Sequence, residues 1–241
     1  MINLGISLLV YALVLLALKF GAGLSPLYAA LLALLGFAGC FFLLSRRTSR
    51  QLTQLMEGVQ RDMQAGRTEK AVKSLQDSYS LGKWQFFVTS QINAQIGCIL
   101  YLKRDFAQAF DYLQKGFSRH WVAMAMLAIC YMKRNKPEQM KAAFEKAVAA
   151  TKNESLVWSL YAFCLDKVGE RGKAIEVLEK GVKKGAADDT LLTNLAALQE
   201  GKKMKMKGYG DLWYQFHLEK PGAMMKQQTR AVQGRRKIVR R

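Results

Sequence analysis

The sequence predicts an all-α protein in which an apolar two-helix hairpin precedes an α-solenoid of about four to five helical hairpins. Three observations support this prediction. The first 45 residues carry one charged side chain, Lys19, whereas all 18 acidic residues follow, from Glu57 onward. Beyond Thr48, apolar residues recur at helical rather than strand spacing, and the chain holds only 3 prolines. Finally, similar segments return every 32 to 34 residues, which is typical of stacked helical repeats.

Two N-terminal apolar runs are long enough to cross a membrane as helices. They cover residues 2–20 and 24–44, and roughly 20 apolar residues span a hydrocarbon core of ~30 Å. Only Gly21-Ala22-Gly23 separates them, so we predict an antiparallel hairpin with Lys19 at its tip. Residues 1–45 are therefore expected to form a transmembrane helical hairpin.

Two other readings of this region are weaker. A cleaved signal peptide needs a positively charged start and a shorter apolar core, but Met1-Ile2-Asn3 carries no basic side chain. The segment Phe37-Ala38-Gly39-Cys40 resembles a bacterial lipobox. It is followed, however, by the apolar residues Phe41 to Leu44, which continue the membrane span.

The expected orientation follows from Arg46, Arg47 and Arg50, which come directly after the second apolar run. Basic residues next to a span stay on the cytoplasmic side. Two spans return the chain to the same side, so the N-terminus and the C-terminal domain should both be cytoplasmic. We expect an integral membrane protein, and the small size and compact hairpin favour the bacterial inner membrane.

The remainder reads as paired helices with internal similarity. Phe144 and Leu178 are equivalent by position, as are Ala147 and Gly181, and each pair is 34 residues apart. Small residues mark where paired helices approach closely: Gly97, Ala109, Ala128, Ala162 and Ala174. The apolar spacing predicts helices near residues 85–103, 106–117, 121–134, 137–150, 155–168 and 171–183.

This pattern resembles the tetratricopeptide repeat family, whose unit is a helix–turn–helix of ~34 residues. Residues 86–188 carry the resemblance, with Trp158 at the aromatic opening position of its repeat. Residues 46–85 would form a degenerate first repeat beside the membrane, and 189–222 a degenerate capping repeat with a helix over the aromatic run 212–217. Met140 departs from the family pattern, since it stands where a small residue is usual.

The resemblance implies a right-handed superhelix whose first helices line a concave groove for a peptide or a helix from a protein partner. Each hairpin cannot bury its apolar face alone, so the stack builds one core and leaves an extended surface. The family's basic clamp for a C-terminal carboxylate is missing. The groove residues that the register implies are Ala94, Cys98, Tyr101, Leu102, Ala125, Ile129, Met132, Lys133, Ser159, Phe163, Asp166 and Lys167.

Basic residues are concentrated at the C-terminal end of a chain whose net charge is +19. Residues 223–241 hold seven basic and no acidic residues, and they are too polar to form a core, so we predict a disordered tail. The tail could remain solvated, or bind anionic lipid, an acidic protein or nucleic acid, although no nucleic-acid-binding motif is present. Its candidate anion-binding residues are Lys226, Arg230, Arg235, Arg236, Lys237, Arg240 and Arg241.

The sequence shows no pattern that indicates catalysis, a cofactor or a metal site. The four cysteines lie in apolar helical contexts without C-x-x-C spacing, which favours a reducing compartment. His120 and His217 have no cysteine or carboxylate at ligand spacing. Phosphate-binding, serine-hydrolase and zinc-protease motifs are missing. We therefore expect a protein that is not an enzyme.

The predicted function is that of a membrane-anchored scaffold or adaptor, which binds a protein partner in its groove at the cytoplasmic face. The main alternative is a membrane-tethered binder of nucleic acid or anionic lipid that acts through the basic tail. A third reading makes the hairpin itself the interface, since Tyr11, Tyr28, Gly36, Ala38 and Gly39 could pack against other membrane helices.

Overall fold

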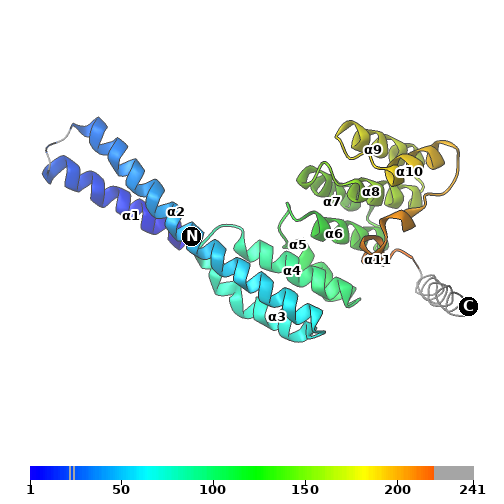
Figure 1. The fold of residues 1–241 in the computed structure, drawn as a ribbon, viewed down its shortest axis with the longest axis horizontal. Helices are drawn as coiled ribbons and strands as arrows, with labels where there is room; N and C mark the ends of the chain where they lie inside the picture. Colours follow the sequence, from blue (N-terminus) through cyan, green and yellow to red (C-terminus); the bar gives the residue numbers. More distant parts are fainter. Residues whose placement is uncertain (22, 24, 220–241) are drawn as a thin grey trace, which may run out of the picture. The chain divides into compact units, whose positions relative to one another are not determined.

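The structure, a computed structural model, describes residues 1–21, 23 and 25–219. These residues form helices joined by turns, and no strand occurs among them (Figure 1). The predicted all-α fold is confirmed. The chain divides into two compact units, Met1–Ala123 and a second that begins at Met124. The division falls in the first turn of α6 (Trp121–Lys133).

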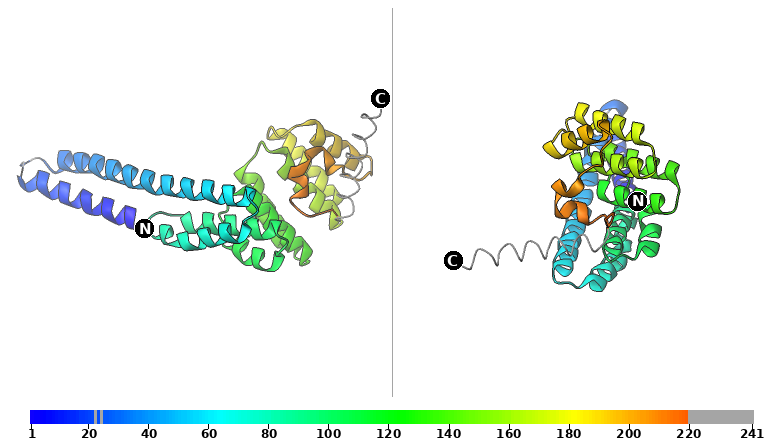
Figure 2. Two further views of the ribbon diagram at one scale, coloured as in Figure 1. Left: turned by 60° about the horizontal axis from the view of Figure 1, so that its bottom comes forward. Right: turned by 90° about the vertical axis from the view of Figure 1, so that its right-hand side faces the viewer.

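The first unit begins with the predicted helical hairpin. Helix α1 (Ile2–Leu16) continues into a π-helical turn (Ala17–Gly21) and lies beside α2 (Pro26–Gln64), as Figures 1 and 2 show. Pro26 stands at the start of α2, where its missing N–H costs no helical hydrogen bond. By length and composition, both helices could cross a membrane.

Polar side chains link the two helices at the base of the hairpin. Asn3 Nδ2 donates to Thr48 Oγ1 over 3.1 Å, and both side chains are buried. Ser7 Oγ donates to the Asn3 carbonyl over 2.8 Å, and Thr48 Oγ1 donates to the Leu44 carbonyl over 3.2 Å. Because buried polar groups need partners, the Asn3–Thr48 bond favours one register of α1 against α2.

Helix α2 extends without a break from the apolar part into the first polar helical pair. Its second half packs against α3 (Thr68–Asp77), where Ala71 and Leu75 are fully buried. Gly66 makes the turn between them with a φ of +73°, a conformation that glycine adopts without strain. A 3₁₀ segment, η2 (Ser78–Lys83), follows α3.

Helices α4 (Val88–Leu102) and α5 (Phe106–Gln114) form the next hairpin. They approach closely at Gly97, where an added Cβ would lie 2.7 Å from Leu113 Cγ. Helix α4 starts three residues later than the sequence indicated. The reason is Phe87, whose φ of 65° lies in the left-handed region and cannot belong to a right-handed helix.

In its described residues, the second unit contains most of α6, four further long helices and the short helix α11 (Asp211–Tyr214). Phe144 and Leu178 are fully buried, as predicted for core positions. Phe144 stacks on Tyr161 with a centroid distance of 4.9 Å, which joins one helical pair to the next. The four further long helices are α7 (Pro137–Ala150), α8 (Ser155–Lys167), α9 (Arg171–Lys183) and α10 (Asp189–Gln199), and the first three match the predicted spans closely.

The chain after α10 departs from the expected capping helix. It forms a 3₁₀ turn, η3 (Met206–Tyr209), and the short helix α11 (Asp211–Tyr214). The helix expected over residues 212–217 stops after one turn, because His217 has a left-handed φ of 50°. The predicted tail, residues 223–241, lies outside the described residues.

Candidate partner-binding surfaces

The predicted groove residues fall into two groups of equal size. The first group is buried within its own unit, and it consists of Ala94, Cys98, Tyr101, Ala125, Ile129 and Ser159. The second group keeps surface that a partner could reach, and it consists of Leu102, Met132, Lys133, Phe163, Asp166 and Lys167. Direct contact with a partner is therefore open only to the second group in this conformation.

In the first unit, three of the four candidates pack inward. The Tyr101 ring meets Phe106 edge-on at a centroid distance of 5.0 Å. Burial raises the pKa of the Cys98 thiol to about 12, so it stays protonated and acts as a small apolar side chain. Leu102, at the end of α4, is the one candidate of this unit with substantial exposure, at 40%.

In the second unit, the chain covers part of the α8 surface with its own residues 202–219, which we call the return segment. Ser159 Oγ and Tyr209 Oη share a hydrogen bond of 2.8 Å, although they lie 50 residues apart. The Trp213 ring meets Phe163 edge-on at 4.9 Å. Burial raises the pKa of Tyr209 to about 12, so its hydroxyl remains a neutral hydrogen-bonding group.

Further hydrogen bonds fix the start of the return segment. The Lys205 N–H donates to Asn194 Oδ1 over 2.6 Å. Arg171 donates to the carbonyls of Gly201 and Lys202, over 3.0 and 2.5 Å. The Asn194 side chain is buried, and a buried amide group is costly to leave without a partner. These bonds therefore stabilise the path of the chain across α8 and α10.

Beside this contact, the second unit has a cleft of about 620 Å³, which we call the α8 cleft. The Lys167 ammonium lies 5.3 Å from the centre of the Phe163 ring, a cation–π distance. Asp166 pairs with Arg171 over 3.2 Å. Three of the cleft's lining residues, Phe163, Asp166 and Lys167, are predicted groove residues, whereas those from the return segment carried no repeat pattern that would have indicated them. The lining residues are Phe163, Asp166, Lys167, Lys203, Met204, Lys207, Leu218 and Glu219.

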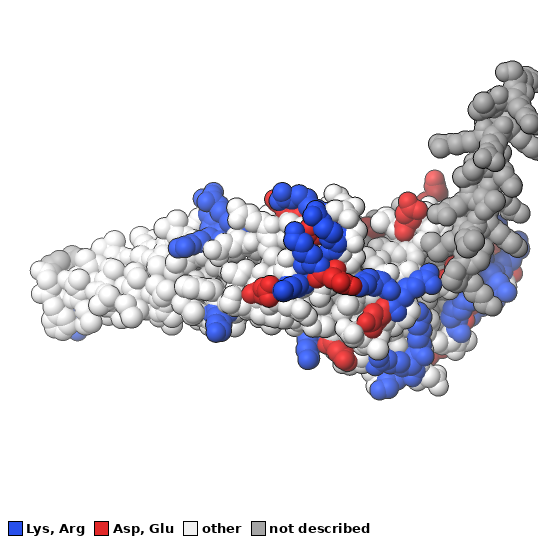
Figure 3. All heavy atoms as spheres, turned by 90° about the horizontal axis from the view of Figure 1, so that it is seen from below, with Lys and Arg blue, Asp and Glu red and all other residues white. Residues whose placement is uncertain are grey.

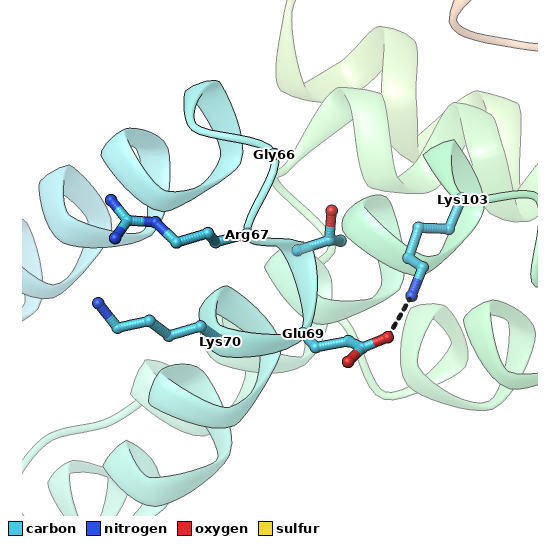
Figure 4. Close-up of a pocket in the computed structure, with 6 residues that line it drawn as sticks. Gly66, Arg67, Glu69, Lys70 and Lys103 are labelled. Atoms are coloured by element: carbon cyan, nitrogen blue, oxygen red, sulfur yellow. Dashed lines mark ion pairs between the residues drawn. The ribbon is translucent and has the colours of Figure 1, made fainter.

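The first unit has a pocket of about 530 Å³ at the turn between α2 and α3 (Figure 4). Its basic side chains already have acidic partners. Lys103 pairs with Glu69 over 3.6 Å, and Arg67 and Lys70 each lie 3.3 Å from an oxygen of Asp62. A bound anion would have to compete with these carboxylates, so the pocket gives little support to an anion site.

No group of three or more His, Cys, Asp or Glu residues within metal-binding reach occurs in residues 1–21, 23 and 25–219. His120 has a structural role instead. Its Nδ1 accepts a hydrogen bond of 3.1 Å from the Ala123 N–H, in the first turn of α6. Burial lowers the His120 pKa, which favours the neutral ring that can accept this bond.

This geometry predicts that acidification weakens the first unit through His120. The unfolded chain takes up a proton near its ordinary pKa of about 6.5, whereas the folded chain resists until lower pH. The stabilisation is therefore complete above about pH 6.5 and is lost as pH falls below that value. Denaturant unfolding should show this loss, and His120→Asn, which can cap the helix without titrating, should reduce it. An unchanged pH slope in the variant would contradict the assignment.

Stacked antiparallel helical pairs of this kind are characteristic of helical-repeat proteins, a class that presents extended surfaces to other proteins. Residues 123–154, which contain most of α6 and all of α7, match the tetratricopeptide repeat family. The match agrees with the resemblance that the sequence pattern implied, and it places one tetratricopeptide-type repeat in this part of the chain.

Solved structures of MamA are similar in fold at low sequence identity. A structure described as "Crystal structure of MamA" shares 16% identity and a TM-score of 0.45, over 62% of this chain and 86% of that one. "MamA RS-1 ArsTM double mutant" shares 17% identity and a TM-score of 0.48, over 69% of this chain and 92% of that one. No curated protein matches the chain.

The predicted anion-binding residues of the tail, from Lys226 to Arg241, all lie outside the described residues.

Proposed function

We propose that this protein is a membrane-anchored adaptor, which holds its repeat domain at the cytoplasmic face and binds a protein partner at the α8 cleft. The observation that carries the proposal is the cleft itself: it joins groove candidates on α8 that keep accessible surface to lysines of the return segment. Leu102, Met132 and Lys133 remain candidates for additional contacts.

The exposure of the hairpin supports membrane anchoring. Only 6% and 11% of the residues in the most apolar stretches of the two helices are buried. A core helix of a soluble protein would bury most of that surface, so the hairpin needs an apolar environment from elsewhere. On the face in view in Figure 3, the hairpin is almost free of charge, and Lys and Arg side chains begin near its base. This distribution supports a cytoplasmic domain.

The composition of the α8 cleft indicates the chemistry of its partner. Three lysines line it, against two carboxylates, and Arg171 pairs with one of these, Asp166. Phe163, Met204 and Leu218 supply apolar surface between the charges. Methionine and aromatic side chains adapt to varied apolar partners. The cleft therefore suits an acidic segment of a protein that carries an apolar side chain.

Reversing the charge of the cleft should abolish capture of this partner. The test is affinity capture of the full-length protein from native membranes in mild detergent, with Lys167→Glu and Lys207→Glu combined. Both substitutions lie at exposed positions, so the fold should be retained. The variant cleft offers an acidic partner two negative charges in place of two positive ones, so the amount of captured partner should fall to background.

The matched control reverses the exposed residues Lys180 and Lys184, which lie on or next to α9 and outside the cleft lining. This control should retain the partner. If the cleft variant and the control retain it equally, the cleft is not the binding site. Deleting residues 223–241 tests the alternative function. If this deletion abolishes all binding while the cleft variant still binds, the basic tail is the binding site.

A further inference from the structure

We propose that Trp84, Phe86 and Phe87 form a second membrane contact, which inserts into the headgroup region of the bilayer that holds the hairpin. We call these three residues the aromatic loop. The inference rests on the proposed membrane anchoring and adds to it a surface that fixes the first repeat against the lipid. The sequence signal was present as three aromatics within four residues, at the start of the helix predicted near residues 85–103.

The aromatic loop is hydrogen-bonded to the start of the hairpin. The Asn3 N–H donates to the Trp84 carbonyl over 3.2 Å, and the Met1 ammonium donates to the Lys83 carbonyl. The first N–H groups of a helix have no partner within the helix, so these carbonyls satisfy groups that α1 leaves open. Figure 1 shows the segment between α3 and α4 passing close to the N-terminus. The loop is thus held at a defined level of the hairpin.

That level corresponds to the membrane–water interface. Asn3 also contacts Thr48, so Asn3, Thr48 and Trp84 lie at one height along the hairpin. Thr48 is four residues beyond Leu44, where the apolar run ends, which is about 6 Å along a helix. The headgroup region extends roughly 5–8 Å beyond the hydrocarbon core on each side. The aromatic loop therefore lies within the depth of the headgroups.

The exposure of the loop is unusual for large apolar side chains. Trp84, Phe86 and Phe87 are 41%, 42% and 63% exposed. Phe87 also has a left-handed φ of 65°, which is unfavourable for a bulky residue. The fold thus keeps a strained backbone while leaving the ring only partly covered, by Phe117 at a centroid distance of 5.6 Å. Strain of this kind points to a role outside the folding of the unit itself.

A lipid surface explains the composition of this region better than a protein partner. Arg47 lines a small pocket with Trp84 and Leu44, so a basic and an aromatic side chain meet where the apolar run ends. Tryptophan is enriched at membrane interfaces, and basic residues on this side attract anionic headgroups. The loop is also continuous with the exposed apolar residues Met1 and Ile2 at the start of α1.

The depth of the loop can be measured with a nitroxide at residue 87. The full-length protein would carry Cys40→Ala and Phe87→Cys, while the buried residues Cys98, Cys130 and Cys164 stay in place. It is labelled, then reconstituted into phosphatidylethanolamine–phosphatidylglycerol vesicles. Collision rates with oxygen, which concentrates in lipid, are compared with those of a water-soluble nickel chelate. Matched reporters at Leu35, in the middle of the hairpin, and Leu102, at the far end of α4, give the deep and aqueous limits.

We expect the oxygen-to-nickel ratio at residue 87 to be severalfold above that at 102 and below that at 35. A ratio at 87 equal to that at 102, with 35 in lipid, would overturn the inference and leave the membrane anchor standing. Low collision rates with both reagents at 87 would show a protein partner or a second copy on the loop, which also overturns it. A water-exposed label at residue 35 would contradict the proposed membrane anchoring, and it would overturn the inference as well.

Discussion

Replacing Trp213 with alanine is expected to lower the free energy of unfolding of the second unit by about 3–5 kcal/mol. The Trp213 side chain is 1% exposed, and its ring meets Phe163 edge-on. Its Nε1 makes no hydrogen bond to another described residue, so the loss is one of packing. Removing the indole leaves a cavity, and α11 is only a single helical turn, so it cannot rearrange to fill that space.

Thiol labelling in increasing denaturant measures this effect in each unit separately. Cys164 is fully buried in α8, and Cys98 is buried in α4 of the first unit. Burial raises the pKa of both thiols, so they react slowly until the surrounding helices unfold. Trp213→Ala should move the labelling midpoint of Cys164 to lower denaturant and leave that of Cys98 unchanged.

The neighbouring residue provides the control for this prediction. Leu212 lies in the same helical turn and is 59% exposed, so Leu212→Ala should change the midpoint only slightly. An equal midpoint for Trp213→Ala and the unsubstituted protein would show that the return segment does not stabilise α8. The cleft residues Lys203, Met204 and Lys207 would then not be held in the arrangement described above.

Gly97→Ala is expected to destabilise the first unit, although alanine favours helices over glycine by about 1 kcal/mol. An added Cβ would lie 2.7 and 2.8 Å from side-chain atoms of Leu113 and 3.1 Å from its backbone nitrogen. The backbone of α5 cannot move without disturbing its own packing. Overpacking of this kind costs about 1–3 kcal/mol, which outweighs the gain in helix propensity.

The matched control is Gly58→Ala, in the interior of α2 of the same unit. A Cβ at Gly58 meets nothing within 4 Å, so only the gain in propensity remains. The two variants should shift the labelling midpoint of Cys98 in opposite directions, with Gly97→Ala at lower denaturant. If both variants were stabilised, α4 and α5 would not be held at the observed separation.

The positions of the repeat helices could be predicted from the sequence because they depend on local patterns of apolar residues. Apolar residues at helical spacing bury one helix face, and this is set by the order of neighbouring residues. Phe144 and Leu178 could therefore be recognised as core positions, and both are fully buried. The equivalent positions also indicated the tetratricopeptide repeat, and residues 123–154 match that family. The ends of helices were predicted less accurately. Helix α4 starts after Phe87 because this residue has a left-handed φ, and the spacing of apolar residues does not indicate such a conformation.

The candidate site could be predicted only in part from the sequence. Phe163, Asp166 and Lys167 were selected by their register on one helix, and all three line the α8 cleft. The same register selected Ser159, which is buried beneath Tyr209 of the return segment. A register states which face of a helix a residue occupies. It does not state what the rest of the chain places on that face.

The sequence by itself determined that this protein is helical, that it contains a tetratricopeptide-type repeat at residues 123–154, and that residues 1–45 form an apolar hairpin. These properties follow from spacing and composition within short segments. Only the tertiary structure decided that residues 202–219 return across α8, and that Trp84 lies level with Asn3 and Thr48. Contacts of this kind join residues far apart in the chain, and they form because buried polar groups and aromatic rings find partners that no local pattern specifies.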